Sequence, residues 1–220
     1  MGKIKNNKSK NMNNGYLRVK NSIEKEVIIE KSRFIAYTKM TPTEDEAKAF
    51  VDGIRKKHPF ATHNCYAYVT EGGKVARFSD DGEPQGTAGI PMLEVLKNRG
   101  LRDTTVVVTR YFGGIKLGAG GLVRAYSSTT SLGLDEAGVE ENVLSSVYKI
   151  TFGYDKYSLF LKFIEKYRHE TISSDFEQDI VVKVAVPTQT TDFCEKLIDC
   201  FLGKVEALET GKTFVVYGEV

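Results

Sequence analysis

Cations and glycines are concentrated in one short segment, VVVTRYFGGIKLGAGGLVR, which runs from Val106 to Arg124. The β-branched residues at its start predict a strand buried on both faces, and the small residues from Ala119 onward predict a helix. A strand that passes through glycines into a helix leaves unpaired N–H groups at one point, where the helix dipole also favours negative charge. The segment therefore predicts a site for phosphate-like anions, with contacts from Arg110, Gly113, Gly114, Lys116, Gly118, Gly120, Gly121 and Arg124.

The glycine spacing matches neither of two common nucleotide-binding motifs. Gly113 and Gly118 have the outer spacing of a Walker A loop, but Ala119 and Gly120 stand where Lys and Ser or Thr would be needed. Gly118 and Gly120 begin like a Rossmann fingerprint, but Val123 takes the third small position. A general anion-binding site therefore remains as the functional interpretation of this segment. The structural alternative is that the glycines allow a sharp turn and close packing of the helix on the sheet.

A second polar segment, Arg77 to Pro84, places three carboxylates within four positions. Asp80, Asp81 and Glu83 could hold a hard cation such as Mg²⁺, although their spacing is not that of an EF-hand. The alternative, a polar turn whose acids pair with Arg77 or Arg110, is favoured, so we predict no metal and no cofactor. Such a loop is also typical of a binding loop on a rigid scaffold. We expect the cleft rim to consist of Arg77, Ser79, Asp80, Asp81 and Glu83.

The third group of reactive residue types is His58, His63 and Cys65. On a strand, His63 and Cys65 would point to the same face, where they could form a Cys–His dyad or part of a metal site. The chain has no CxxC or HxxxH pair to complete a zinc site, no GxSxG elbow and no HExxH motif. Cysteine is also commonly a small buried hydrophobe. The case for an enzyme is weak, and no catalytic residue is predicted.

The elements that would position these groups can be outlined from the pattern of apolar residues. Strands are predicted near residues 27–29, 33–38, 62–69, 74–78 and 106–109. Thr43 and Glu46 form a capping box at the start of one helix, and Gly100 is placed to end a second that begins near Thr87. From residue 146 onward the order is strand, helix, strand, strand, helix, strand, which is the ferredoxin-like βαββαβ pattern.

The length of 220 residues is comfortable for two domains. We expect a disordered basic tail at 1–15, an N-terminal α/β domain at 16–138, a linker at 139–144 and a ferredoxin-like domain at 145–218. Residues 97–124 carry six cations and one acid, so positive charge is local, while the net charge of the whole chain is only +2. A nucleic-acid interface over the whole surface is therefore excluded.

Three further observations concern location. No apolar run approaches the roughly 20 residues that span a bilayer, and the N-terminus lacks the apolar core of a signal peptide. The three cysteines form no disulfide framework, which fits a reducing compartment. We expect a cytoplasmic protein that does not associate with membranes.

Several long motifs, which occur in order, closely resemble the IMPACT/YigZ family: SRFIA at 32–36, His58-Pro59 with ATHNCYAY at 61–68, SDDGEPQGTAG at 79–89, and TRYFGGIKLG at 109–118 with GGLVRAY at 120–126. The resemblance implies that the N-terminal domain has the fold of the second domain of ribosomal protein uS5. It also implies that the C-terminal domain is similar to the last domain of elongation factor G. A link to translation is implied as well, because the eukaryotic relatives bind the ribosome-associated activator of the amino-acid-starvation kinase. It implies no catalytic residues.

These observations predict an α+β protein of two domains that acts as a translation-associated regulator. Its expected partner is RNA or a ribosome-associated protein, bound through a cationic glycine-rich cleft in which Arg110, Lys116 and Arg124 contact phosphate. One alternative is a hydrolase-like enzyme that acts in the same cleft on a small phosphorylated or peptide substrate. That enzyme would use either Cys65 with His63 or a metal on the acidic loop. The other alternative is a protein-binding module without cleft chemistry.

Overall fold

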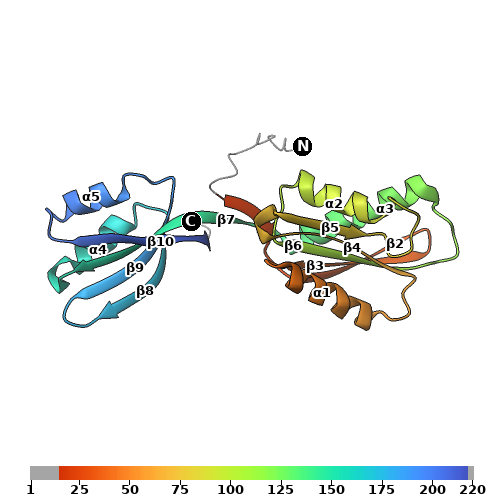
Figure 1. The fold of residues 1–220 in the computed structure, drawn as a ribbon, viewed down its shortest axis with the longest axis horizontal. Helices are drawn as coiled ribbons and strands as arrows, with labels where there is room; N and C mark the ends of the chain where they lie inside the picture. Colours follow the sequence, from red (N-terminus) through yellow and green to blue (C-terminus); the bar gives the residue numbers. More distant parts are fainter. Residues whose placement is uncertain (1–14, 218–220) are drawn as a thin grey trace. The chain divides into compact units, whose positions relative to one another are not determined.

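A computed structural model describes residues 15–217 of the chain. These residues form two units, one of residues 16–140 and one of residues 141–217 together with Gly15. Each unit is a mixed α/β structure built on an antiparallel sheet (Figure 1). The predicted basic tail lies outside the described residues except for Gly15, which begins β1 (Gly15–Val19). None of the described helices is long and apolar enough to cross a membrane.

The sheet of the first unit has β6 at its centre. Its strand order is β2-β3-β6-β4-β5, with bounds β2 (Ile23–Ile29), β3 (Ser32–Met40), β6 (Thr104–Tyr111), β4 (His63–Thr70) and β5 (Val75–Ser79). Val106 and Val108 of β6 pack in the larger core, while Val107 packs in a smaller core on the opposite face. The prediction of a strand buried on both faces is therefore confirmed.

Helices cover both faces of this sheet, because its central strands are apolar on both sides (Figure 1). α1 (Glu44–Lys57) packs on one face, and α2 (Gly89–Asn98) and α3 (Gly118–Ala137) pack on the other. The N-cap half of the capping box is confirmed, since the Glu46 N–H donates to Thr43 Oγ1 at 3.2 Å, while the Glu46 carboxylate accepts from the Thr43 hydroxyl at 3.0 Å. Gly100 follows α2 with a φ of +67°, as expected of a residue that ends a helix.

Two tight connections bring loops together at one end of the first unit. The β2–β3 hairpin turns at Glu30 and Lys31, both with positive φ, which is the conformation of a two-residue hairpin loop. At Gly113, just after β6, an added Cβ would lie only 2.1 Å from the Lys31 carbonyl group, so only glycine fits there. A short 3₁₀ turn, η1 (Glu71–Gly73), joins β4 to β5.

The second unit follows the predicted order of elements. These are β7 (Val139–Phe152), η2 (Tyr154–Lys156), α4 (Tyr157–Ile164), β8 (Glu170–Phe176), β9 (Ile180–Pro187), α5 (Phe193–Cys200) and β10 (Glu206–Val216). Its strands lie in the order β10-β7-β9-β8, and both helices pack on one sheet face around Ile150, Val182 and Val184.

The segment predicted as a linker, 139–144, is regular strand in the structure. These residues are the first part of β7, and residues 142–144 pair with residues 214–216 of β10. The polar run Glu140 to Asn142 is typical of a linker, but a strand that exposes alternate side chains accommodates the same residues. The two units divide between Glu140 and Glu141, within this strand.

Candidate functional site

Arg110 lies on the central strand of the first unit and is buried. In the sheet register it is opposite Phe34 of β3 and His63 of β4. Arg110 is only 5% exposed, and its Nη1 donates to Glu83 Oε1 at 2.6 Å. Its guanidinium lies 5.2 Å from the centre of the Phe34 ring and 5.5 Å from that of Phe112. The structure therefore places Arg110 in an internal ion pair, the alternative that the sequence left open for the acidic loop.

The Glu83 carboxylate contacts three elements of the first unit, namely β4, β6 and α3. The same Oε1 that accepts from Arg110 also accepts from the Tyr126 hydroxyl of α3 at 2.8 Å. Burial raises the pKa of Tyr126 well above its usual value, so this hydroxyl remains a donor. Nε2 of His63 lies 3.8 Å from Glu83 Oε2, while Nδ1 of His63 bonds to the Asp81 carbonyl at 2.8 Å. Because a carbonyl oxygen only accepts, the proton of this bond is on Nδ1.

Asp80 caps the N-terminus of α2 from the loop that precedes it. Its Oδ1 accepts from the N–H groups of Ala88 and Gly89 at 3.0 and 2.8 Å, and its Oδ2 accepts from Gly86 N–H at 2.9 Å. A carboxylate at this position satisfies donors that a helix start leaves unpaired. Asp80 therefore holds the loop closed on α2.

Asp81 is occupied in the same way. Its Oδ1 accepts from Arg55 Nη2 at 2.8 Å, and its Oδ2 accepts from the Asn64 N–H at 2.7 Å. Among residues 15–217, no group of three His, Cys, Asp or Glu side chains is placed to hold a metal ion. Of the other expected rim residues, Ser79 accepts from the Asp81 N–H, whereas Arg77 is exposed on β5, with its Nε 3.9 Å from Glu44 Oε1.

Cys65 is not placed to act as a nucleophile. It is fully buried, and its thiol donates to the Asp80 carbonyl at 2.9 Å. Burial raises the pKa of this thiol, whereas a nucleophilic cysteine needs a lowered one. His58 lies elsewhere, between the hydroxyls of Tyr37 and Tyr111 at 2.6 and 2.9 Å, and desolvation lowers its pKa. The three residues thus do not form one reactive centre.

The predicted glycines differ in what they do. Gly113 allows the close approach to Lys31, and its N–H donates to Ser32 Oγ at 3.1 Å. Gly114 and Gly118 have positive φ values, whereas a Cβ on Gly120 would meet only the Arg124 side chain at 3.8 Å. α3 begins after Leu117, whose side chain has no oxygen with which to cap the helix.

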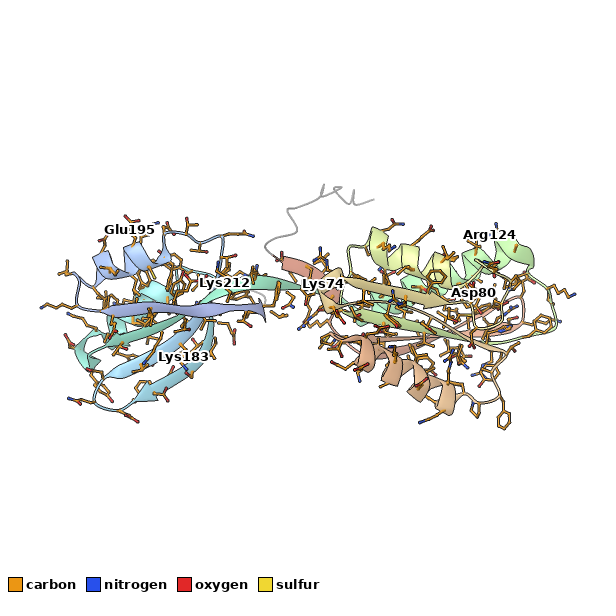
Figure 2. All side chains as sticks on the ribbon, viewed as in Figure 1. Lys74, Asp80, Arg124, Lys183, Glu195 and Lys212 are labelled. Carbon is orange, nitrogen blue, oxygen red and sulfur yellow. The ribbon has the colours of Figure 1, made fainter. Side chains whose placement is uncertain are left out.

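A surface groove of about 860 Å³ runs along the start of α3. Lys116, Gly121 and Arg124 line it, but Arg110 does not. Lys116 and Arg124 are exposed, and neither makes an ion pair with any residue in the described part of the chain. Figure 2 labels Arg124 on α3 and Asp80 in the loop after β5. The rest of the lining consists of Ile29, Glu30, Ile115, Leu117, Val123, Ala125, Ser127, Ser128 and Ser131.

Comparison with known proteins identifies the family. The family model described as the Impact N-terminal domain matches residues 30–134. Over 211 residues the chain is 44% identical to the IMPACT family member YvyE of Bacillus subtilis (strain 168), an alignment that covers 93% of this chain and 95% of that protein. The chain belongs to the IMPACT family. This membership confirms the resemblance carried by the sequence motifs.

A second relative and a solved structure also match most of the chain. It is 36% identical over 184 residues to the IMPACT family member YigZ of Escherichia coli (strain K12), covering 82% of this chain and 90% of that protein. A solved structure titled "Crystal structure of an hypothetical protein" matches with a TM-score of 0.58 and 34% identity, over 89% of this chain and 97% of that one.

The part of the chain that matches the IMPACT domain model contains the buried ion pair and nearly all of the groove. The sequence alone assigned no role to three contributors to the ion-pair network and the groove: Arg55, Tyr126 and the serines of α3. No spacing connects Arg55 with Asp81, or Tyr126 with Glu83, because only the folded sheet brings these pairs together. The position of the serines could have been predicted, because Ser127 and Ser131 are four residues apart and therefore share a helix face.

Proposed function

We propose that this chain is a translation-associated regulator that binds RNA, free or in a ribonucleoprotein, through Lys116 and Arg124 at the groove along α3. The observation that carries the proposal is that both cations are exposed at one groove and have no ion-pair partner among residues 15–217. Cations that have no internal partner are free to neutralise phosphates and release their counterions. Such a role belongs in the cytoplasm, where ribosomes work.

The groove has a positive charge balance. Glu30 is the one acidic residue in its lining, against Lys116 and Arg124. The N–H groups at the start of α3 lie beside these two side chains and add the positive end of the helix dipole. Arg110 has a different role in this proposal, because its charge is neutralised internally by Glu83. We therefore assign phosphate contact to two of the three cations that the sequence grouped together.

The association with translation rests on the IMPACT family and on the folds that the resemblance implies. We infer that the second unit is ferredoxin-like, because it combines the element order βαββαβ with the strand order β10-β7-β9-β8. We also infer that the first unit has the fold of the second domain of ribosomal protein uS5, as the resemblance implies.

The experiment measures RNA binding by fluorescence anisotropy, with a labelled stem-loop RNA that offers both paired and unpaired nucleotides. The Lys116→Gln/Arg124→Gln variant is compared with a control of equal charge change on α4 and just beyond it, Lys162→Gln/Lys166→Gln. Each lost phosphate contact lowers the slope of log affinity against log salt by roughly 0.7–0.9, so the groove variant should lose about 1.5 from that slope. The control should behave like the wild type.

Two results would overturn the proposal. One is a wild-type chain that does not bind the stem-loop even at a low salt concentration of ~50 mM. The other is an equal loss of binding in both double variants, which would show general attraction of RNA to positive charge rather than a site. A groove variant that binds RNA normally but loses a protein partner would favour the protein-binding module.

The hydrolase alternative is not proposed further, because no contact among residues 15–217 favours it. Cys65 would need to be an accessible thiolate, yet its thiol is buried and hydrogen-bonded to a carbonyl. Asp80, Asp81 and Glu83 would need free oxygens that converge on one point. Instead, the three carboxylates are directed to a helix start, to Arg55 and to Arg110 respectively.

A further inference from the structure

We infer that the nucleic acid bound at this groove is single-stranded RNA, held by stacking of its bases on apolar and aromatic side chains as well as by phosphate contacts. This inference rests on the proposed function and specifies its ligand. It depends on a property of the groove that the sequence did not predict, namely that most of the exposed surface of its lining is apolar.

The groove also offers apolar surface, which a ligand bound by charge alone would leave uncovered. Ile29, Ile115, Leu117 and Val123 contribute apolar surface, and Ile115 and Val123 are each 37% exposed. A duplex presents phosphates and sugars outward and keeps its base faces stacked inside, so it gains little from apolar surface. An unpaired strand exposes base faces that can cover such surface while its phosphates meet nearby cations.

An exposed aromatic ring stands in the loop that leads into the groove. Phe112 is 46% exposed and lies three residues before Ile115. Its ring is held in position by the Arg110 guanidinium, whose centre lies 5.5 Å away, and its N–H donates to Thr62 Oγ1 at 3.0 Å. A ring that is fixed by its neighbours and half open to solvent loses little entropy when a base stacks on it.

The next loop along this end of the unit adds a second exposed ring. Phe60 is 91% exposed and lies two residues before Thr62, the residue that accepts from Phe112 N–H. Two residues of extended chain span at most ~7 Å, so both aromatic residues belong to one end of the unit. Aromatic residues interleaved with unpaired cations are the arrangement by which proteins bind single strands without sequence preference.

The hydroxyl groups of the groove also suit RNA. Ser127, Ser128 and Ser131 line the same side of α3 as Val123 and Arg124. The Ser127 and Ser131 hydroxyls can donate and accept, as a ribose 2′-hydroxyl can, whereas the side chain of an acidic peptide offers acceptors only. The Ser128 hydroxyl donates to the Ala125 carbonyl at 3.1 Å and is left as an acceptor. Charge, apolar surface and hydroxyls together match a ribonucleotide strand better than a peptide.

The test compares a labelled single-stranded RNA of ~12 nucleotides, a length within the usual range of single-strand sites, with the duplex of the same sequence. The variant is the full chain with Phe112→Leu. The control is Phe78→Leu, because the Phe78 side chain has a similar exposure, 44%, and lies on the edge strand β5. Phe112→Leu should weaken single-strand binding by about fivefold or more, since stacking contributes that much per base, and leave duplex binding unchanged. The control should change neither.

A second pair of variants guards against a folding effect, because Phe112 also covers Arg110. Val123→Asp puts a negative charge in the groove, and Leu132→Asp puts the same charge on α3 outside the groove lining. Val123→Asp should weaken single-strand binding at least ~10-fold through repulsion and lost apolar contact, and Leu132→Asp should not. An acidic peptide that displaces the RNA as well as unlabelled RNA does would overturn the inference in favour of a protein ligand.

Failure of this inference and failure of the proposed function give different results. If Lys116→Gln/Arg124→Gln weakens single-strand and duplex binding equally while Phe112→Leu and Val123→Asp weaken neither, RNA binding stands and the single-strand inference is wrong. If the double variant changes neither form, both are wrong.

Discussion

Replacing Arg110 by alanine should destabilise the first unit, because Arg110 is half of a buried ion pair. The substitution removes the Nη1 bond to Glu83 Oε1 at 2.6 Å and leaves the Glu83 carboxylate, whose side chain is 3% exposed, without its cation. Tyr126 O–H would remain as one donor, and the His63 ring would remain at 3.8 Å. The guanidinium contacts with Phe34 and Phe112 would also be lost.

The expected loss follows from what breaking a buried pair costs. Removing one partner of such a pair typically costs about 3–5 kcal/mol, because the other charge stays buried and uncompensated. Here the lower end applies, since the Nε of Arg110 is itself buried without a hydrogen-bond partner and already lowers the stability of the wild type. A loss of about 3 kcal/mol in a unit of this size lowers its Tm by roughly 10–15 °C.

The assay must follow the first unit separately, because the chain has two units and no tryptophan. Hydrogen exchange read by mass spectrometry on peptides from β6 and α3 gives the opening free energy of this unit. Arg77→Ala is the matched control, since it removes an arginine whose side chain is 60% exposed and should change stability by less than ~0.5 kcal/mol. The double variant Arg110→Met/Glu83→Gln should recover much of the loss, because it removes both charges together.

One result would refute this reasoning. If Arg110→Ala leaves exchange on β6 unchanged and abolishes binding of the stem-loop RNA, Arg110 is a phosphate ligand, as the sequence alone predicted, and the Glu83 pair contributes nothing to stability. If the variant loses stability but the remaining folded protein binds RNA with the wild-type salt slope, the internal role assigned to Arg110 is correct.

Three further predictions concern other parts of the chain. Because burial lowers the pKa of His58, the unfolded chain binds the proton at higher pH, so stability should fall as the pH drops below the ordinary value of 6.5. Thermal melts should show this fall in the wild type, and His58→Gln should flatten it. Alkylation followed by mass spectrometry should modify Cys194, which is partly exposed, long before Cys65, and rapid labelling of Cys65 would contradict its burial. Gly113→Ala should lower Tm sharply through its clash with the hairpin backbone, whereas Gly120→Ala should leave Tm nearly unchanged; equal effects would refute the distinction between them.

Local signals were enough to predict most elements of the fold. The three valines of β6 indicated a strand buried on both faces because any strand sends successive side chains to opposite sides. The N-cap at Thr43 could be predicted because Thr43 and Glu46 lie within one helical turn. The sequence did not predict that β7 begins as early as Val139, because a strand can carry polar residues wherever one of its faces is exposed, and the pairing with β10 is set by residues about 70 positions away.

The site was predictable only in part, for a related reason. Sequence could place six cations near the glycine segment, but the pairing of each cation depends on groups that are distant along the chain. Arg110 and Glu83 are 27 residues apart, and Arg55 and Asp81 are 26 apart. The side on which each side chain lies follows from the register of β6 between β3 and β4, which no local pattern encodes.

The two helix starts on the same face of the sheet show why anion binding is assigned to α3 rather than α2. Both helices follow loops that contain glycine, and both begin with N–H groups that have no partner within the helix. The start of α2 already holds an anion, because the Asp80 carboxylate accepts from Ala88 and Gly89. The start of α3 follows Leu117, which cannot cap it, and lies beside Lys116. An anion at α2 would have to displace Asp80, whereas an anion at α3 would meet donors and a cation that have no internal partner among the described residues.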